Sequence, residues 1–494
     1  MEIWSNAVEA HEAIDLQDLR LCVSFALDAI ANDPSIVEAE VCASWCEQNI
    51  APFQYGADQP DDAILMPQSR TVLGIGILVI VEGPYGRRVG FGTESDDLTV
   101  DGIQQALINA KQGVRPSPAF HLPDPIPLPA QTAPFFDPEV IRLPLQDMQG
   151  FATEALDGAL TTLRDAGFVA QLHVQGHIAC RKAYVMIGNT HGVLASDTAT
   201  AMVTDMEASL GEASSHGASC GFSTHVDDFS PYDTGAETAR LAMQARQPIV
   251  LPTGDYTVIF SAQAMADLLH DLLIPALSMD TIAAGASPFA AVYGQSIAPP
   301  WLQVTDHGRL PRMLGSRTVT GEGLPTGATP LITQGHVAGF LADTYHAQTY
   351  ALRFPFLVPR NGMRHHLMHQ NFAMRAGIFP TNVILSSDEA VDLNTLLAPV
   401  SEGIYIGRLW SLAPQGPMQH GDFSGAIIGP SFHIQNGQLT RPLRPNAMRL
   451  QANLPQLLQA LTGASTRSRA IVSPTMQFQV VSPDIRCHQV RVTA

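Results

Sequence analysis

The sequence is short of charge, of cysteine and of long apolar runs. Charged side chains make up 15% of its 494 residues and hydrophobic side chains 46%, which is too apolar a composition for an intrinsically disordered chain. The longest apolar run, Val72–Val81, is interrupted by two glycines and is too short to span a bilayer. We therefore expect folded domains and no membrane segment, with this run forming a buried strand.

The cysteines and the beginning of the chain bear on its compartment. The six cysteines contain no CxxC pair, which favours reduced thiols. The first residues show no basic region followed by an apolar core, which is the pattern of a secretory signal. We expect a cytoplasmic protein.

Basic residues are also scarce. Lys and Arg number 27 against 46 Asp and Glu, which gives a net charge of −19. Proteins that bind nucleic acids contact the phosphates through Lys and Arg, so this balance argues against a nucleic acid as the main partner.

The length and the apolar pattern predict two domains of an α+β fold. A single hydrophobic core stops growing well below 494 residues, and we place the domain boundary near Arg246. Residues 1–246 are predicted to form an N-terminal α/β domain with a mixed or antiparallel sheet and helices. Residues 247–494 are predicted to form a glycine-rich, β-rich domain.

Apolar spacing and turn residues predict the individual elements. Helical steps on either side of Asn32-Asp33-Pro34 predict two helices within Leu16–Gln48. Gly83-Pro84-Tyr85-Gly86 and Asn436-Gly437 predict the turns of two hairpins. The other expected elements of the first half are helices at Asp101–Lys111, Val140–Gly167 and Thr234–Arg246, an extended connection at Arg115–Pro138, and strands at Phe168–Cys180, Lys182–Ile187, Val193–Met206 and Ser214–Thr224. Those of the second half are strands at Val383–Leu385, Ser401–Leu412, Ser424–Gln435, Met476–Val481 and Gln489–Val492 and a helix at Leu454–Thr462.

The stretch Val258–Met279 is predicted to be a strand that leads into an amphipathic helix. Ser261 can cap the first turn of this helix, and its apolar face carries four leucines between residues 268 and 273. His270 and Asp271 lie side by side on this helix and suggest a metal site. Pro275 is expected to end or kink the helix, because proline lacks the backbone donor and its ring clashes with the preceding turn.

Other histidine patterns leave several alternatives open. His11-Glu12 resembles the start of a zinc-protease motif but lacks the second histidine, so a solvated helix start is the simpler interpretation. His173 and His177 lie in a strand pattern, about 13 Å apart at ~3.3 Å per residue, too far to share one ion. His365 and His369 could bind zinc or copper if they lie on a helix, and otherwise belong to an exposed loop or an interface. The acid, hydroxyl and histidine groups in Asp343–His346 and Gln419–Ser424 are close in sequence, which does not by itself make a catalytic triad.

An ordered series of motifs resembles the TldD/PmbA family, whose members are metallopeptidases also named as modulators of DNA gyrase. The motifs run through nearly the whole chain and are Gly90-Phe-Gly-Thr93, Gly188-Asn-Thr-His-Gly192, Leu251-Pro-Thr-Gly-Asp-Tyr-Thr-Val258, Leu314-Gly-Ser-Arg-Thr-Val-Thr-Gly-Glu-Gly-Leu-Pro-Thr326, Pro330-Leu-Ile-Thr-Gln-Gly-His-Val-Ala-Gly-Phe-Leu-Ala-Asp343, Pro380-Thr-Asn-Val-Ile-Leu385, Glu402-Gly-Ile-Tyr-Ile406, Gly421-Asp-Phe-Ser-Gly425 and Gln435-Asn-Gly-Gln438.

The resemblance implies which kind of subunit this chain is. One kind carries HExxxH on a helix, where two histidines and a later cysteine hold zinc and the glutamate activates its water. The other kind, PmbA or TldE-like, lacks that motif and pairs with the first. Aligned with the family, His270 takes the place of the first histidine, Asp271 that of the glutamate and Pro275 that of the second histidine. No cysteine occurs in Gln459–Arg469, where the family would place the third ligand.

By resemblance, we expect a non-zinc-binding subunit of a heterodimeric TldD/TldE-type metallopeptidase that processes or degrades unfolded or leader-bearing peptides. Zinc is expected in a TldD-like partner, and this chain is expected to have no catalytic residue or metal ligand. An independent enzyme with a remodelled site that acts on a peptide-derived small molecule, and a peptide-binding homodimer, are the alternatives. The residues expected to line a substrate channel or an interface are His270, Asp271, Arg317, Asp343, His365, His369, His420 and Asp422.

Overall fold

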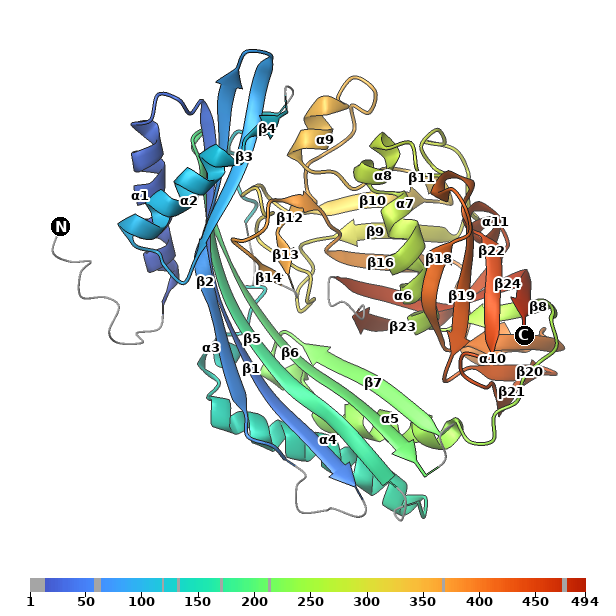
Figure 1. The fold of residues 1–494 in the computed structure, drawn as a ribbon. Helices are drawn as coiled ribbons and strands as arrows, with labels where there is room; N and C mark the ends of the chain where they lie inside the picture. Colours follow the sequence, from blue (N-terminus) through green and yellow to red (C-terminus); the bar gives the residue numbers. More distant parts are fainter. Residues whose placement is uncertain are drawn as a thin grey trace.

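The computed structural model describes residues 14–56, 64–117, 120–130, 134–168, 172–211, 215–366, 369–472 and 478–494. Its fold is α+β, as predicted, with an antiparallel sheet in the first half of the chain and a larger mixed sheet in the second (Figure 1). Among these residues, no helix is long and apolar enough to cross a membrane. The pair His11-Glu12 lies outside the described residues.

The first sheet has the strand order β4-β3-β2-β1-β5-β6-β7, and all its neighbouring strands are antiparallel. Short turns join β2 to β3 at Gly83–Gly86, as predicted, and β5 to β6 at Gly188–Gly192. The strands are β1 (Glu38–Gly56), β2 (Gln68–Gly83), β3 (Gly86–Ser95), β4 (Arg115–Pro116), β5 (Leu172–Asn189), β6 (Leu194–Leu210) and β7 (His216–Ser223).

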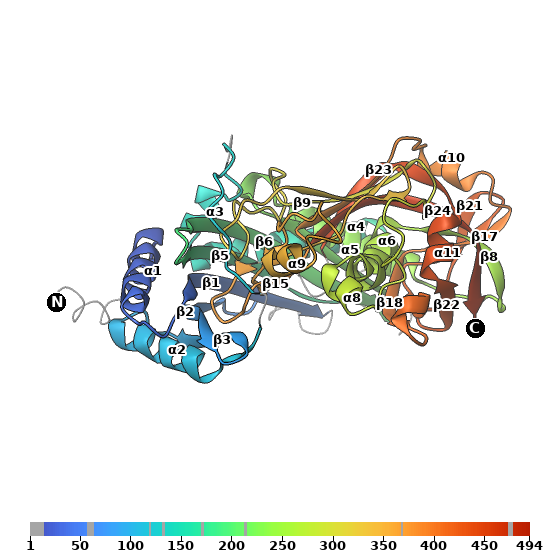
Figure 2. The same ribbon diagram turned by 90° about the horizontal axis from the view of Figure 1, so that it is seen from above.

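Helices cover one face of this sheet. They are α1 (Leu16–Ala31), α2 (Val100–Gln112), α3 (Pro138–Arg142), α4 (Met148–Asp165) and α5 (Pro231–Gln244). The helix α2 lies so close to β3 that a Cβ atom added at Gly92 would be 2.2 Å from the Ala110 nitrogen. Gly92 belongs to the motif Gly90-Phe-Gly-Thr93, so that motif serves helix packing here. Figure 2 shows α1 and α2 at the end of the molecule away from the second half.

The predicted second helix of Leu16–Gln48 is wrong, because the chain forms strand β1 from Glu38 onward. All nine residues from Glu38 to Cys46 are buried, since this strand is central and covered on both faces. Without an exposed face the strand has no alternation, and the helical spacing of Val37, Val41 and Trp45 is coincidental. The predicted break near Arg181 is also wrong, since β5 runs without interruption from Leu172 to Asn189.

The second sheet is mixed, with the order β11-β10-β9-β16-β24-β8-β17-β20-β21 and with β18, β19, β22 and β23 attached to it. The pairs β16–β24 and β8–β17 are parallel. The strands are β8 (Gly254–Phe260), β9 (Leu302–His307), β10 (Ala328–Thr333), β11 (His336–Val337), β16 (Asn382–Ser387), β17 (Glu402–Ile406), β18 (Arg408–Pro414), β19 (Asp422–Ile428), β20 (Phe432–Gln435), β21 (Gln438–Pro442), β22 (Met448–Asn453), β23 (Leu461–Val472) and β24 (Gln479–Thr493). Two small hairpins pair β12 (Gly362–Met363) with β15 (Gly377–Ile378) and β13 (His365–His366) with β14 (His369–Gln370).

Several details of the second half differ from the sequence prediction. The strand β23 replaces the end of the predicted helix Leu454–Thr462, which stops at Gln459 as α11 (Leu454–Gln459). From Gln479 onward the last two predicted strands belong to one long strand, β24, while Met476 and Gln477 lie outside the described residues. The hairpin turn at Asn436-Gly437 is confirmed, and both residues have the positive φ, 50° and 75°, that such a turn requires. The remaining helices are α6 (Ala262–Leu268), α7 (Ile274–Ala276), α8 (Met279–Ala283), α9 (Thr344–Thr349) and α10 (Leu393–Leu397).

The two halves meet on the face of the first sheet that the helices leave uncovered. Glu40 of β1 forms a buried ion pair with Arg364, and Ser44 Oγ accepts a hydrogen bond of 3.0 Å from the Phe372 N–H. Further along, Asp197 of β6 accepts a hydrogen bond of 3.2 Å from the Thr318 N–H. We call this contact surface the seam. The domain boundary near Arg246 remains a prediction.

Candidate functional site

The helix that follows β8 contains one π-helical turn. Ser261 caps its start as predicted, because its Oγ accepts a hydrogen bond of 3.1 Å from the Ala264 N–H. After α6, residues Leu269–Leu273 form the π turn, in which the Ile274 N–H bonds to the Leu269 carbonyl. The helix then ends at Ala276, directly after Pro275. The prediction that Pro275 kinks or ends the helix is confirmed.

The π turn decides which residues share a face of this helix. A π turn brings residues five apart into register, whereas an α turn does so for residues four apart. His270 and Pro275 are five apart, the same spacing as the two histidines of HExxxH. The π turn therefore brings Pro275, whose ring has no donor atom, to the face of the helix that carries His270.

The His270 side chain is held by two neighbours. Its Nδ1 lies 2.6 Å from Asp271 Oδ1, and its ring stacks on Phe478 with the centroids 5.0 Å apart. The imidazole is mostly buried, at 16% exposure, while the Asp271 side chain is 37% exposed. The pair lies at the surface of the helix, and stacking on Phe478 orients the imidazole ring.

The donors at this helix do not fit a zinc ion. Zinc is held by several nitrogen, sulfur or oxygen ligands that converge on one point. Pro275 has no donor atom, and the Asp271 carboxylate is engaged with His270. Cys487 is buried in β24, with its Sγ 3.8 Å from the Leu457 carbonyl oxygen. Within the described ranges, no group of three or more His, Cys, Asp and Glu side chains is placed to hold a metal ion.

Asp267, which the sequence analysis did not single out, ties the helix to β18. Its Oδ2 accepts a hydrogen bond of 2.8 Å from the Leu409 N–H, and its Oδ1 accepts one of 3.0 Å from Gln263 Nε2. Burial raises the pKa of Asp267 to about 6, although these hydrogen bonds favour the ionised form. An acidic residue within the apolar face of a helix is the signal that could have identified it.

Arg408 of β18 connects this helix electrostatically with the first sheet. The positive charge of Arg408 favours the ionised forms of Asp267 on α6 and of Asp205 on β6. Its guanidinium lies over the Trp410 ring, 5.9 Å from the centroid, and its buried Nε has no hydrogen-bond partner among the described residues. The start of β18 therefore faces both the helix and the sheet.

Two of the predicted site residues, Arg317 and Asp343, lie at the seam. Arg317 is buried, and its Nη1 donates to the carbonyl oxygens of Leu314 at 2.8 Å and Ser316 at 2.6 Å. Asp343 caps α9 through a hydrogen bond of 2.9 Å from the His346 N–H, and the His346 ring also contacts its carboxylate. Neither residue is in the group formed by His270 and Asp271.

Asp343 also belongs to a buried cluster of charges at the seam. With Glu40 and Glu322 it lines a cavity of about 150 Å³. Burial, reinforced by the charges of Asp343 and Glu40, raises the pKa of Glu322 to about 8. Arg364 neutralises Glu40. Glu40, Glu322 and Arg364 come from three distant parts of the sequence, so their grouping could not be seen in it.

The remaining predicted residues lie elsewhere. His420 and Asp422 are exposed at the start of β19, where Asn453 Nδ2 donates to the His420 carbonyl at 2.6 Å and to Asp422 Oδ1 at 3.0 Å. His365 and His369 form part of the β13–β14 hairpin rather than a helix, beside the middle of the first sheet (Figure 1). The side chains of residues 365–369 lie outside the part that the structure describes.

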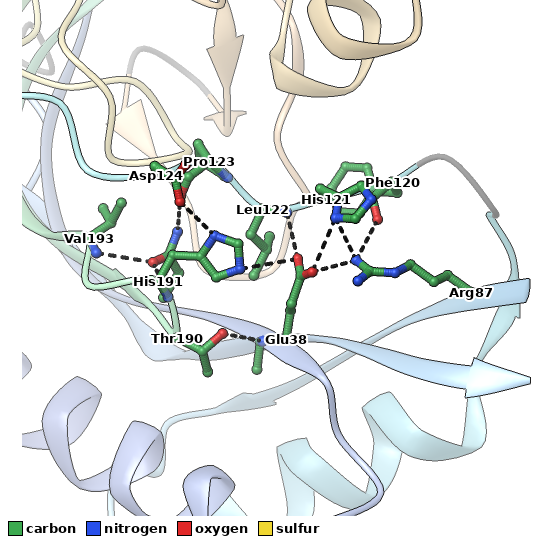
Figure 3. A network of polar contacts seen from close by, with 12 residues as sticks. Glu38, Arg87, Phe120, His121, Leu122, Pro123, Asp124, Thr190, His191 and Val193 are labelled. Carbon is green, nitrogen blue, oxygen red and sulfur yellow. Dashed lines mark hydrogen bonds and ion pairs between the residues drawn. The ribbon is translucent and has the colours of Figure 1, made fainter.

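A second polar network surrounds Glu38 (Figure 3). Its Oε2 accepts a hydrogen bond of 2.8 Å from the Leu122 N–H and lies 3.5 Å from His191 Nε2, while Arg87 pairs with its Oε1. Burial opposes ionisation of Glu38, but the Leu122 N–H and Arg87 outweigh it and lower the pKa of this carboxyl. Asn189 Nδ2 donates to the Pro123 carbonyl at 2.9 Å. Through Asn189, the motif Gly188–Gly192 therefore binds the connection Arg115–Pro138 to the first sheet.

The second half of the chain is similar to proteins of one known family. Residues 253–494 match the family described as PmbA/TldA metallopeptidase C-terminal domain. A metalloprotease TldD homologue of Haemophilus influenzae is 24% identical over 211 residues, 42% of this chain and 40% of that protein. A metalloprotease PmbA homologue of Buchnera aphidicola is 22% identical over 246 residues, 49% of each chain. The matched region thus spans less than half the length of these two curated relatives.

Solved structures share the fold of the whole chain. TldE from Thermococcus kodakarensis superposes with a TM-score of 0.77 and 18% identity, covering 97% of this chain and 100% of that one. At this identity the likeness shows the fold alone. The match of residues 253–494 and the two curated relatives support the assignment of this chain to the TldD/PmbA family, and its fold agrees with that assignment.

Proposed function

We propose that this chain is the non-zinc-binding subunit of a heterodimeric TldD/TldE-type metallopeptidase that processes or degrades unfolded or leader-bearing peptides in the cytoplasm. The observation that carries the proposal is the π turn at Leu269–Leu273, which aligns His270 with a proline. This helix could present two metal ligands five residues apart, but only His270 has a side chain that can bind a metal. Such a helix fits a subunit that no longer binds zinc.

The helix is well suited to a supporting role. Asp267 fixes it to β18, and the His270 ring packs against Phe478 just before β24. The hydrogen bond of Asp267 would keep the helix in place without a metal. Zinc and the water it activates would be supplied by the TldD-like partner, and this chain would bind and orient the peptide beside them.

Two strand edges offer places for a peptide. Among the described strands, β7 pairs with β6 alone and β18 with β19 alone. An extended peptide can add to such an edge, because its backbone hydrogen bonds give affinity with little dependence on sequence. The charge of Arg408 on β18 acts on Asp205 and Cys220, which lie on β6 and β7. The start of β18, to which Asp267 ties the helix, is therefore near the outer strands of the first sheet.

The experiment is co-expression with a TldD-like protein, followed by purification through a tag on this chain. We expect a stable complex whose zinc follows the partner and which cleaves an unfolded test peptide. This chain alone is expected to contain no stoichiometric zinc and to cleave nothing. Zinc or cleavage by this chain alone would favour an independent enzyme built on the His270-Asp271 pair, and tight peptide binding by a dimer of this chain alone would favour a peptide-binding homodimer.

A further inference from the structure

Part of the seam-forming face of the first sheet is left open. Beyond the region that contacts the second half, the face carries rows of polar side chains from β1, β5, β6 and β7. Strand register aligns His173 with Ser209 and His216, Gln175 with Gln54 and Glu207, and His177 with Asp205 and Cys220. Residues paired in this way point to the same side of a sheet, so these rows form one surface.

Two adjoining hollows lie on this surface. One has a volume of about 500 Å³ and the other about 550 Å³, and both are lined by Gln54, Gln175 and Glu207. His173 and His216 line the first hollow, while His177 and Asp205 line the second. Because the two hollows adjoin along β5, from His173 to His177, they have room together for several residues of an extended chain.

The lining of the two hollows contains acidic side chains but no lysine or arginine. Asp205 and Glu207 are the acidic residues of the lining. The Glu207 side chain is 50% exposed, with Gln175 Nε2 at 3.3 Å and His216 Nε2 at 3.5 Å from its Oε2. Burial raises the pKa of Asp205, and the charge of Glu207 adds to this effect, whereas His177 and Arg408 oppose it. Two acidic side chains therefore share the surface with glutamine, serine and histidine side chains.

We propose that this open face, defined by Gln54, His173, Gln175, His177, Asp205, Glu207 and His216, binds a lysine- or arginine-bearing segment of an extended peptide. The proposal rests on the proposed function and narrows its substrate class to cationic peptides. Asp205 and Glu207 would pair with the cations of the peptide, while Gln54 and Gln175 can donate to or accept from its backbone. Complementary charge would also speed the encounter with such a peptide.

The test measures the binding of two fluorescently labelled, unstructured peptides of equal length to this chain, one with lysines and one with glutamates on a Gly/Ser background. At pH 8 histidine side chains carry little charge, and low salt keeps electrostatic attraction strong. We expect the lysine peptide to bind at least about tenfold more tightly than the glutamate peptide. We expect Asp205→Asn/Glu207→Gln to lose most of that difference.

A matched control is needed, because the net charge of −19 attracts any cation. Glu154 and Asp157 are exposed on α4, which covers the opposite face of the sheet. Glu154→Gln/Asp157→Asn changes the net charge equally and should leave the preference intact. Equal binding of the two peptides, or an equal loss in both double variants, would overturn the proposal. Because neither zinc nor a partner enters this measurement, such a failure is separate from a failure to form the heterodimer.

Discussion

Arg364 of the second half and Glu40 of the first sheet form an ion pair in which both side chains are almost fully buried. Arg364 also donates to the Gly321 carbonyl at 2.7 Å through its Nε, and this glycine belongs to the motif that contains Glu322. The motif Leu314–Thr326 is therefore placed at the seam between the two sheets, where Thr318 and Gly321 take part in its contacts.

The first prediction concerns this ion pair. Arg364→Met leaves the Glu40 carboxylate buried without its partner, and we expect the free energy of unfolding to fall by about 3–5 kcal/mol. Urea denaturation followed by tryptophan fluorescence measures the change. The exposed pair of Arg240 and Glu237 supplies the control, since Arg240→Met should cost at most about 1 kcal/mol. Similar losses in the two variants would show that the seam pair is not important for stability.

The second prediction concerns the buried Glu322. The pKa of Glu322 is raised from its ordinary value of 4.5 to about 8 in the folded chain. Between these values the folded state binds a proton that the unfolded state has released, so stability falls as the pH rises from about 4.5 to about 8. Glu322→Gln replaces the titrating carboxyl with an amide. We therefore expect the free energy of unfolding of the variant to fall less than that of the native chain between these pH values. Parallel pH profiles in thermal denaturation would contradict the burial of an ionisable group here.

The features that depend on local chemistry were predictable from the sequence. The cap at Ser261, the end of the helix at Pro275 and the hairpin turn at Asn436-Gly437 each follow from the geometry of a few neighbouring residues. The prediction of a second helix within Leu16–Gln48 was wrong. Strand β1 is buried on both faces, so its sequence lacks the alternation of apolar and polar residues that identifies a strand. The order of the strands in the second sheet had no local signal.

The candidate site was predicted only in part, because most of its groupings depend on contacts between residues distant in the sequence. His270 and Asp271 are adjacent in sequence and were identified, and the π turn that sets their register with Pro275 could not be seen from apolar spacing. Asp205 and Arg408 are separated by about 200 residues in the sequence. Tertiary packing brings them close enough for the charge of Arg408 to act on the Asp205 carboxyl. Arg317 and Asp343 were expected near a channel or interface, and they lie at the seam within the chain.

The third prediction is that His270 is a remnant of a metal site. We expect His270→Ala to leave folding and the peptidase activity of the complex nearly unchanged. A loss of activity beyond about tenfold, or ~1.4 kcal/mol, in steady-state assays would contradict this. Asp267→Ala is the useful comparison, because it removes the acceptor of the Leu409 N–H and should destabilise the chain by about 1–3 kcal/mol.

The fourth prediction concerns restoration of the motif. Asp271→Glu/Pro275→His recreates HExxxH on a helix whose π turn already brings residues 270 and 275 into register. We nevertheless expect no stoichiometric zinc, because the third ligand is missing and two histidines alone do not complete a tetrahedral site. Elemental analysis after dialysis would decide the matter, with the native chain as the control. One zinc per chain in the double variant would show that another side chain serves as the third ligand.

The central claim is that this chain depends on another for the metal. The most direct measurement is the zinc content and the peptidase activity of three samples: this chain alone, a TldD-like partner alone, and their complex. Our account predicts that this chain alone has neither zinc nor activity and that the complex holds one zinc per pair and cleaves unfolded peptide. Stoichiometric zinc and cleavage by this chain alone would contradict it.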